Sequence, residues 1–258
     1  MVEKTRHEPG TFCWVELATT DATAAKRFYE SLFGWTSTDL PGPAGAYTIL
    51  RKNGRDAAAL YQLRPEPPGA RPSWTSYVRV ESTDDAVAHA KEIGGNVRMG
   101  PYDAGENGRM AVIEDPTGAV FSVWEPKGNP GVGVVNEPGS FCWQELYTRD
   151  PERAADFYSG LFGWKREARH MDFGDYVIFE QSGTMMAGMM RIPKEWGPMP
   201  SHWLVYFAVD DCDATVDEAR GLGASVTIAP MDVETAGRFA MLSDPQGAGF
   251  AVIKLKSA

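Results

Sequence analysis

The sequence predicts an α+β fold of four βαβββ modules, arranged as two tandem domains with curved mixed sheets. Two observations lead to this prediction. The chain repeats itself without an insertion, since GTFCWVEL at residues 10–17 returns as GSFCWQEL at residues 139–146. Within each copy, short strands with alternating apolar residues surround segments in which apolar residues recur at helical spacing, and this order occurs twice.

The first module begins with a predicted strand at residues 12–18. Asp21 or Thr20 then caps the free amide groups of a helix. Apolar residues recur at helical spacing as far as Phe33, and Gly34 ends the helix. The turn-rich segments PGPAG and KNGRD separate three further strands, predicted at residues 35–40, 46–51 and 57–63.

The second module follows a proline-rich connector at residues 64–72. Its expected elements are a strand at 74–80, a helix at 84–93, and strands at 96–99, 109–114 and 119–124. The second copy repeats the whole order. We therefore expect a first domain at residues 9–126, a Gly- and Pro-rich linker at 127–138 and a second domain at 139–258.

Composition narrows the classes of partner. Lys and Arg total 25 against 35 acidic residues, which gives a net charge of −10 without any basic run. Nucleic acid and anionic membranes are therefore not expected partners. No long apolar stretch or signal-peptide core is found, so the sequence predicts a cytoplasmic protein. The 3 cysteines lack metal-ligand or disulfide spacing and are expected to be small buried hydrophobes.

Two motifs in each copy carry a resemblance to a known family. The first helix has the pattern D…A..FY..LFGW, and a DP.G..F turn precedes the last strand. Together with paired βαβββ modules, these motifs resemble the vicinal oxygen chelate superfamily, which includes glyoxalase I, bleomycin resistance proteins, extradiol dioxygenases and tandem hydroxylase-type proteins. The resemblance covers residues 10–255. It implies cup-shaped sheets around a cleft, where the enzymes hold a divalent metal for substrates with adjacent oxygens.

Three of the family's metal-ligand positions can be located in both copies, while a fourth, on a middle strand, is harder to place. They fall on the first, fifth and last strands of each copy and are occupied by Trp14 and Trp143, Thr75 and Leu204, and Ser122 and Ala251. None of these is His, Asp or Glu, so the sequence predicts neither a metal nor another cofactor. His170 and His202 have no counterparts in the first copy. An unusual metal site using one of them stays open beside an ordinary surface role.

Strand alternation together with family geometry directs Phe12, Trp14 and Glu16 toward the first cleft, and places Cys13 under the helix. A carboxylate between aromatic neighbours is desolvated, which raises its pKa and suits it to acid or base catalysis. Glu16 and its repeat equivalent Glu145 are therefore the candidate catalytic residues. The alternative is that both carboxylates lie near the rim and have a structural role.

The candidate substrate-binding residues would clamp a flat ligand, although core packing explains the aromatic ones equally well. They are Trp14, Tyr77, Arg79, Ser122 and Trp124 in the first copy, and Trp143 and Tyr206 in the second. Arg79 is expected to pair with Glu16. Because Ala208 replaces this arginine in the second copy, the first cleft is the expected functional one.

Three functions stay open from the sequence. The leading hypothesis is a protein without the family's metal that binds a hydrophobic or aromatic small molecule. It would sequester that molecule or assist a metal-independent isomerisation or hydroxylation-type step, with Glu16 or Glu145 moving a proton. The alternatives are a metal-dependent lyase or dioxygenase and a non-catalytic binding or regulatory module. A monomer or a homodimer is expected, because two copies in one chain can complete internally what single-copy relatives complete by pairing.

Overall fold

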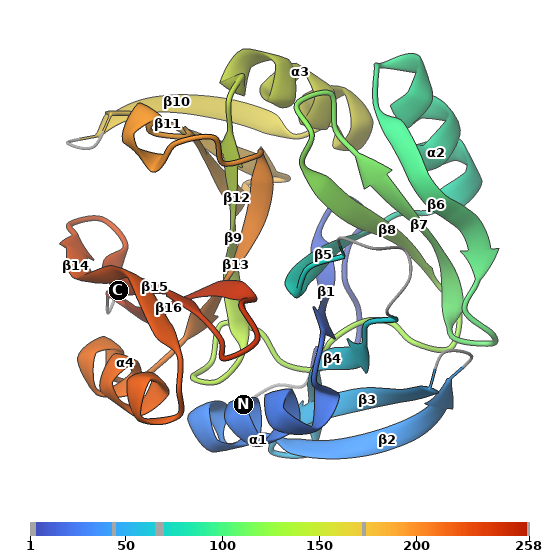
Figure 1. Ribbon diagram of the computed structural model, residues 1–258. Helices are drawn as coiled ribbons and strands as arrows, with labels where there is room; N and C mark the ends of the chain where they lie inside the picture. The colour runs from blue at the N-terminus through green and yellow to red at the C-terminus, as the bar shows by residue number, and fades with distance from the viewer. Residues whose placement is uncertain (1–3, 43–44, 65–69, 172–173, 257–258) are drawn as a thin grey trace.

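The structure is a computed structural model that describes residues 4–42, 45–64, 70–171 and 174–256. It confirms the predicted α+β fold of four βαβββ modules. Each copy of the repeat forms one curved eight-stranded mixed sheet. In Figure 1 the two sheets curve in opposite directions, so that their concave faces point away from each other.

The first sheet and its two helices follow the predicted order closely. They are β1 (Phe12–Thr19), α1 (Ala22–Phe33), β2 (Thr36–Gly42), β3 (Gly45–Lys52), β4 (Arg55–Gln62), β5 (Ser73–Arg79), α2 (Thr83–Glu92), β6 (Asn96–Asp103), β7 (Gly108–Glu114) and β8 (Val120–Pro126). The Asp21 side chain caps α1 by accepting from Ala24 N, and Gly34 ends the helix in the left-handed region. Residues 65–69 of the predicted connector lie outside the described residues.

The second half repeats these elements. They are β9 (Phe141–Thr148), α3 (Pro151–Phe162), β10 (Lys165–Met171), β11 (Gly174–Gln181), β12 (Thr184–Arg191), the 3-10 turn η1 (Lys194–Trp196), β13 (His202–Ala208), α4 (Cys212–Gly221), β14 (Ser225–Val233), β15 (Gly237–Ser243) and β16 (Gly249–Leu255). Asp150 caps α3 through Arg153 N and Gly163 ends it, as Asp21 and Gly34 do for α1. Among the described residues, no helix is long and apolar enough to cross a membrane.

Both sheets have the same strand order. It is β2-β3-β4-β1-β5-β8-β7-β6 in the first half and β10-β11-β12-β9-β13-β16-β15-β14 in the second. The two modules of each half meet at an antiparallel pair, β1 with β5 or β9 with β13, while β1 pairs with β4 and β5 with β8 in parallel. The first and fifth strands of each half therefore form the centre of its cup.

The two sheets lie back to back, with the four helices along the seam. Helix α1 contacts α4, and α2 contacts α3, so each helix pair joins the two halves (Figure 1). A buried hydrogen bond from Ser76 Oγ to Gln144 Oε1, 2.6 Å long, crosses between the central strands. The apolar core is continuous across this seam, because one cluster contains residues of both halves.

The repeated motifs bond reciprocally across the seam. Tyr29 of α1 donates to Asp244 Oδ2 of the other half at 3.0 Å, and Tyr158 of α3 donates to Asp115 Oδ2 at 3.0 Å. Each tyrosine hydroxyl also accepts the indole N–H of its own half's fifth-strand tryptophan, Trp74 or Trp203, at 3.0 and 2.8 Å. The FY..LFGW helix of one half therefore holds the DP.G turn of the other.

The indole that follows each of these helices adds a second reciprocal pair. Trp35 Nε1 donates to the Gly139 carbonyl, and Trp164 Nε1 donates to the Gly10 carbonyl, both at 2.7 Å. All four partners are far apart in sequence, and each bond joins the two halves. We call the two tyrosine bonds and these two tryptophan bonds the seam bonds.

The structure corrects the predicted orientation of Phe12. The pairing of β1 with β5 shifts register between Phe12 and Trp14, so Cys13 is an extra residue in the strand. This bulge turns Phe12 away from the cup and against Trp164 and Trp203, with ring centroids 5.7 and 5.4 Å apart. The prediction of strict alternation was wrong here because an inserted residue reverses the facing of every side chain before it.

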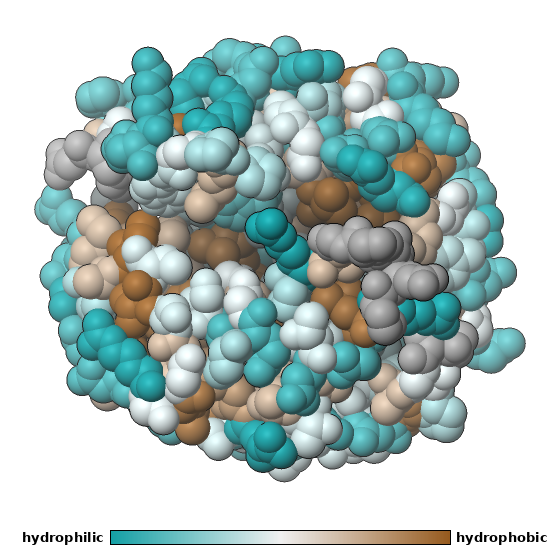
Figure 2. Space-filling view, in the orientation of Figure 1, coloured by the Kyte–Doolittle hydropathy of each residue, from teal (hydrophilic) through white to brown (hydrophobic). Residues whose placement is uncertain are grey.

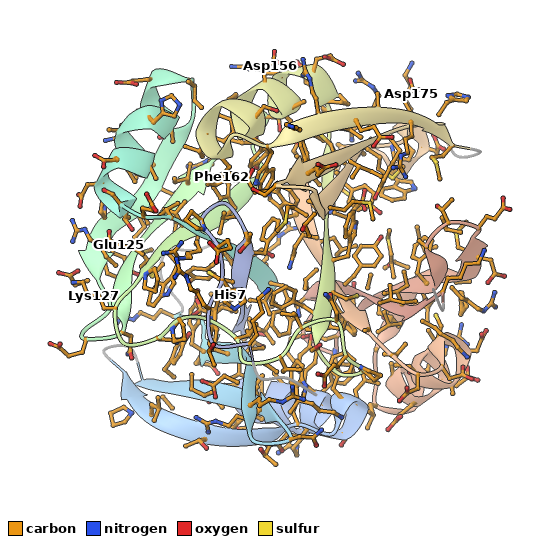
Figure 3. The ribbon with its side chains drawn as sticks, turned by 180° about the vertical axis from the view of Figure 1, so that it is seen from behind. His7, Glu125, Lys127, Asp156, Phe162 and Asp175 are labelled. Atoms are coloured by element: carbon orange, nitrogen blue, oxygen red, sulfur yellow. The ribbon has the colours of Figure 1, made fainter. Side chains whose placement is uncertain are left out.

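The N-terminal tail and the segment after β8 are packed onto the first sheet. His7 of this tail is 1% exposed, and its Nε2 lies 3.0 Å from the Val132 carbonyl oxygen. Figure 3 shows His7 inside the molecule. Burial lowers the pKa of His7 to about 4, so the side chain is neutral. The three cysteines are free thiols, with Cys13 and Cys212 buried and Cys142 only partly so.

Candidate functional site

The centre of each cup contains one glutamate, placed by the first strand of that half. Glu16 on β1 lies opposite Thr75 of β5, and Glu145 on β9 lies opposite Leu204 of β13. Both sheets curve around these positions, so each carboxyl group lies at the centre of its cup, between the first and fifth strands. Part of the Glu16 side chain remains exposed, whereas Glu145 is 4% exposed.

Tyrosine hydroxyls surround the Glu16 carboxylate. Tyr47 of β3 donates to Oε2 at 2.6 Å and Tyr77 of β5 donates to Oε1 at 3.0 Å, so both carboxylate oxygens have a protein donor. Burial raises the pKa of Glu16, and these two hydrogen bonds oppose the rise. The pKa of Tyr77 is raised well above its ordinary value, mainly by burial, so the phenol remains a neutral donor.

Glu145 is bonded on one side only. Tyr176 of β11 and the Trp143 indole both donate to Oε2, at 2.8 and 3.1 Å. Oε1 is buried and has no hydrogen-bond partner among the described residues. Burial raises the pKa of Glu145 to about 8, against the opposing effect of the two donors. At neutral pH the carboxyl is therefore mostly protonated, and a buried acid with a free oxygen is a hydrogen-bond donor in need of an acceptor.

A separate apolar cluster covers the concave face around Glu145. Its buried members include Tyr147, Tyr206 and Met241, with Trp143 and Trp196 packed against them. The Tyr147 and Tyr206 hydroxyls lie 3.3 Å apart, and the Tyr147 ring stacks on His202 at 5.3 Å. Figure 2 shows hydrophobic surface gathered in a hollow between the two arms of the second sheet. In the second cup, apolar side chains therefore surround one buried acid, Glu145.

The structure brings together some of the predicted residues and separates others. Trp14 and Tyr77 are register partners beside Glu16, and Ser122 lies next to Tyr77. Arg79 and Trp124 pair with each other farther along β5 and β8, beyond Ser122. Trp124 donates to the Asn129 carbonyl at 3.0 Å, under the segment that follows β8. In the second half, Trp143 and Tyr206 are register partners beside Glu145, as predicted from the repeat.

The expected ion pair between Glu16 and Arg79 is wrong. In the part of the chain that the structure describes, Glu16 accepts only from the two tyrosines, and Arg79 Nη1 is buried without a partner. The guanidinium lies near His7 of the N-terminal tail and Cys13 of β1, since its charge lowers the pKa of both groups. Arg79 lies two positions beyond Tyr77 on β5, past the bulge, which places its long side chain at the end of the cup rather than over its centre.

Sequence reasoning named Tyr77 but missed the other two tyrosines that donate to the carboxyl groups, Tyr47 and Tyr176. Tyr47 and Tyr176 occupy equivalent positions of the repeat, so the register between the copies was the available signal. Gly188 of β12 was missed as well. A Cβ there would overlap the Tyr176 hydroxyl and lie 2.6 Å from Glu145 Oε2. This glycine therefore gives Tyr176 room to reach the acid, at a position that is Ala59 in the first half.

We expect Gly188→Ala to displace Tyr176 from Glu145 and to destabilise the protein by about 1–3 kcal/mol, because overpacking a filled site forces side chains out of place. Urea unfolding measures the change. Gly249→Ala is the matched control, since a Cβ there would meet Leu204 Cδ1 at 3.7 Å and the Leu242 carbonyl oxygen at 4.0 Å, which are ordinary contact distances. Equal effects of the two substitutions would show that Tyr176 can move to another position without a loss of stability.

The family's metal does not fit the residues of either cup. Among the described residues, no group of three or more His, Cys, Asp and Glu side chains is placed to hold a metal ion. Each cup offers one carboxylate whose neighbours are neutral phenols and an indole, which donate hydrogen bonds to it. His170 is exposed beside Asp175, and His202 lies beside the Pro200 carbonyl and Tyr147. Neither histidine joins Glu145 in a donor set.

Relatives at high identity are similar over their full length. A protein named "Putative glyoxylase CFP32" from Mycobacterium tuberculosis (strain CDC 1551 / Oshkosh) is 40% identical over 258 residues, covering 98% of each chain. "Anthracycline biosynthesis protein DnrV" from Streptomyces peucetius is 37% identical over 265 residues, covering 98% of this chain and 96% of that protein.

Solved structures share the fold at low identity. The Mn(II)-bound glyoxalase from Novosphingobium aromaticivorans has a TM-score of 0.65 at 15% identity, over 96% of this chain and 85% of that one. The 2,3-dioxygenase LapB from Pseudomonas sp. KL28 has a TM-score of 0.66 at 13% identity, over 100% and 94% of the two chains. The family described as "Glyoxalase/Bleomycin resistance protein/Dioxygenase superfamily" matches residues 11–123 and again residues 136–252. The chain therefore belongs to the glyoxalase/bleomycin resistance protein/dioxygenase superfamily.

Proposed function

We propose that the second cup binds a flat, largely apolar molecule that carries an oxygen acceptor, and that protonated Glu145 donates a hydrogen bond to this oxygen. The observation that carries the proposal is the unpartnered Oε1 of Glu145. Both oxygens of Glu16 already accept from tyrosines, so the first cup has no free carboxyl oxygen; its unpartnered buried polar atom among the described residues is the Ser122 hydroxyl beside Tyr77. The proposed working cup is thus the second, and not the first as the sequence suggested.

The surroundings of Glu145 support an aromatic ligand. The apolar cluster supplies Tyr206, Trp143 and Trp196, whose rings suit a flat partner. Two relatives, DnrV and DauV, are named for anthracycline biosynthesis, and anthracyclines have a flat fused carbocyclic quinone that carries carbonyl and hydroxyl oxygens. A ligand of this class fits both requirements, since it has a flat apolar body and an oxygen acceptor.

The chemistry available to such a site is proton transfer without a metal. A carboxyl with a pKa of about 8 can hydrogen-bond a carbonyl oxygen and give it a proton as negative charge develops there. That is sufficient to hold the ligand, and it is also the acid component of an enolisation or isomerisation. We favour this function over a metal-dependent lyase or dioxygenase because each cup offers a single carboxylate donor.

The binding test uses 2-acetylnaphthalene as the probe, with Trp fluorescence as the readout. We expect binding to the wild-type protein to weaken by about tenfold as the pH rises through about 8, because the carboxylate left above that pH cannot donate to the ketone. Glu145→Gln keeps an N–H donor at every pH, so its affinity should be independent of pH. Glu16→Gln should keep the wild-type pH dependence.

The matched probe is 2-ethylnaphthalene, which has the same body and no acceptor. Its binding should not change with pH in any of the three proteins. The proposal fails if the ketone and the hydrocarbon show the same pH dependence, or if Glu16→Gln rather than Glu145→Gln removes it. The second of these outcomes would move the site to the first cup.

A further inference from the structure

The two cups share a centre but differ in the side chains around it. Each contains one glutamate with equivalent tyrosines and a tryptophan beside it. Around this centre, a set of positions in the first cup carries hydroxyl groups, and the repeat equivalents in the second cup are apolar. The pairs are Tyr61 and Met190, Thr75 and Leu204, Tyr102 and Met231, and Ser122 and Ala251. The wall of the first cup is therefore much the more polar of the two.

Strand pairing places these hydroxyl groups on the concave face of the first sheet. Thr75 lies opposite Glu16 in the pairing of β1 with β5. Ser122 lies beside Tyr77, one of the two donors to Glu16. Tyr61 of β4 lies opposite the other donor. Residues that are register partners in a sheet point to the same face, so these three side chains surround the carboxyl group.

Two further phenols reach the cup from its two arms. Tyr61 comes from β4, on one side of the central strands, and Tyr102 comes from β6, the edge strand on the other side. Burial and then the charge of Glu16 raise the pKa of both phenols, that of Tyr61 to about 12. Both are therefore neutral and lie within electrostatic range of the same carboxyl group. Neither hydroxyl has a hydrogen-bond partner in the described part of the chain.

The first cup has unused hydrogen-bonding capacity. Ser122 Oγ is buried and lacks a partner among the described residues, which is unfavourable until a partner is supplied. Each oxygen of Glu16 accepts one bond from a tyrosine and has a second acceptor position. Part of Glu16 is exposed, whereas Glu145 is 4% exposed, so the central carboxyl group of the first cup is the more accessible one.

We propose that the first cup binds a neutral sugar. A sugar hydroxyl both donates and accepts, which suits a wall that presents a carboxyl group together with alcohols and phenols. The hydroxyl groups of the ligand bond to Glu16, Thr75 and the two phenols of the arms, and the innermost one reaches Ser122 directly or through a bridging water. The aromatic neighbours of Glu16 provide apolar surface for the ring carbons. This site does not depend on Glu145 or on a ligand in the second cup.

The test compares methyl pyranosides with a matched ether. The pyranosides are those of β-D-glucose, β-D-galactose and β-D-xylose, and the ether is 2-methoxytetrahydropyran, which has the same ring without hydroxyl groups. Saturation-transfer NMR measures the dissociation constants. We expect at least one pyranoside to bind about tenfold or more tightly than the ether. The combined variant with the residues of the second cup should lose this preference; its changes are Tyr61→Met, Thr75→Leu, Tyr102→Met and Ser122→Ala.

Ser122→Ala alone separates ligand binding from folding. It should weaken the preferred pyranoside by about threefold or more, because one hydrogen bond to the ligand is lost. Its urea midpoint should equal or exceed that of the wild type, because an unpartnered buried hydroxyl is removed from the free protein. Saturating 2-acetylnaphthalene, the probe of the second cup, should not displace the pyranoside.

The proposal is overturned if none of the pyranosides binds more tightly than the ether. It is also overturned if Ser122→Ala or the combined variant, each shown by circular dichroism to be folded, binds the pyranoside as the wild type does. Displacement by 2-acetylnaphthalene would place both ligands in one cup and would likewise overturn it. Binding of tetramethylammonium in place of the pyranosides would make Glu16 and its aromatic neighbours a cation site instead.

Discussion

Glu145→Gln is expected to stabilise the protein at pH 9 by roughly 4 kcal/mol relative to the wild type, and to leave its stability near pH 4.5 almost unchanged. Glutamine resembles the protonated acid in shape and charge, so the two proteins are alike wherever Glu145 is protonated. At high pH the wild type contains a buried, half-bonded carboxylate, and the variant does not.

The direction follows from proton linkage. The pKa of Glu145 is about 8 in the folded protein, compared with an ordinary value of 4.5. Between these values the folded state binds more protons than the unfolded state, so stability falls as pH rises. The contribution is fully present below about pH 4.5 and is lost once pH exceeds about 8. Urea unfolding at pH 5, 7 and 9 measures the difference between the two proteins at each pH.

The control is Glu92→Gln, which removes the same charge from an exposed side chain. Its difference from the wild type should stay within about 0.5 kcal/mol at all three pH values. Stability curves that stay parallel with pH for wild type and Glu145→Gln would contradict the raised pKa of Glu145. They would also remove the basis for placing a proton donor in the second cup.

Tyr158→Phe is expected to lower the free energy of unfolding by about 2–4 kcal/mol. The Tyr158 hydroxyl is fully buried, donates to Asp115 and accepts from Trp203, so its removal leaves two buried groups without a partner. Each orphaned group costs about 1–3 kcal/mol, and a carboxylate costs more than an indole. Chemical denaturation measures the loss, and Tyr29→Phe should give a similar one through Asp244 and Trp74.

The matched control is Tyr102→Phe, which removes the same atom from a side chain that is 40% exposed. It should change stability by less than about 0.5 kcal/mol. If Tyr158→Phe is equally mild, the two reciprocal tyrosine bonds add nothing to the seam and the apolar core alone holds the halves together.

The fold could be predicted because its signals are local. Apolar periodicity defined each helix and strand, and Asp21 and Gly34 marked the ends of α1 as the structure has them. The bulge at Cys13 could not be predicted, since an extra residue in a strand changes no local preference. It reversed Phe12, which is why a residue assigned to the cup is found at the seam.

The candidate site was predictable in part. Repeat register identified Glu16 and Glu145 together with their aromatic neighbours, because equivalent strands put equivalent residues at the centre of each cup. The difference between the two acids lies in how Tyr47, Tyr77 and Tyr176 reach them from other strands. Which carboxyl oxygen each tyrosine reaches depends on close packing, such as the room left by Gly188. The spacing of residues along the sequence does not predict it.

The seam bonds change what the repeated motifs mean. Tyr29 and Tyr158 bond to the turn of the opposite half, and Trp35 and Trp164 bond to the glycine carbonyl just before its first strand. Part of the identity between the two copies therefore comes from the bonds that each half makes to the other, beside the caps and bonds that each half makes within itself. A single copy would have every one of these donors and acceptors but could pair them only with a second copy. The chain therefore contains, as two covalently joined halves, the two subunits that such a dimer would need.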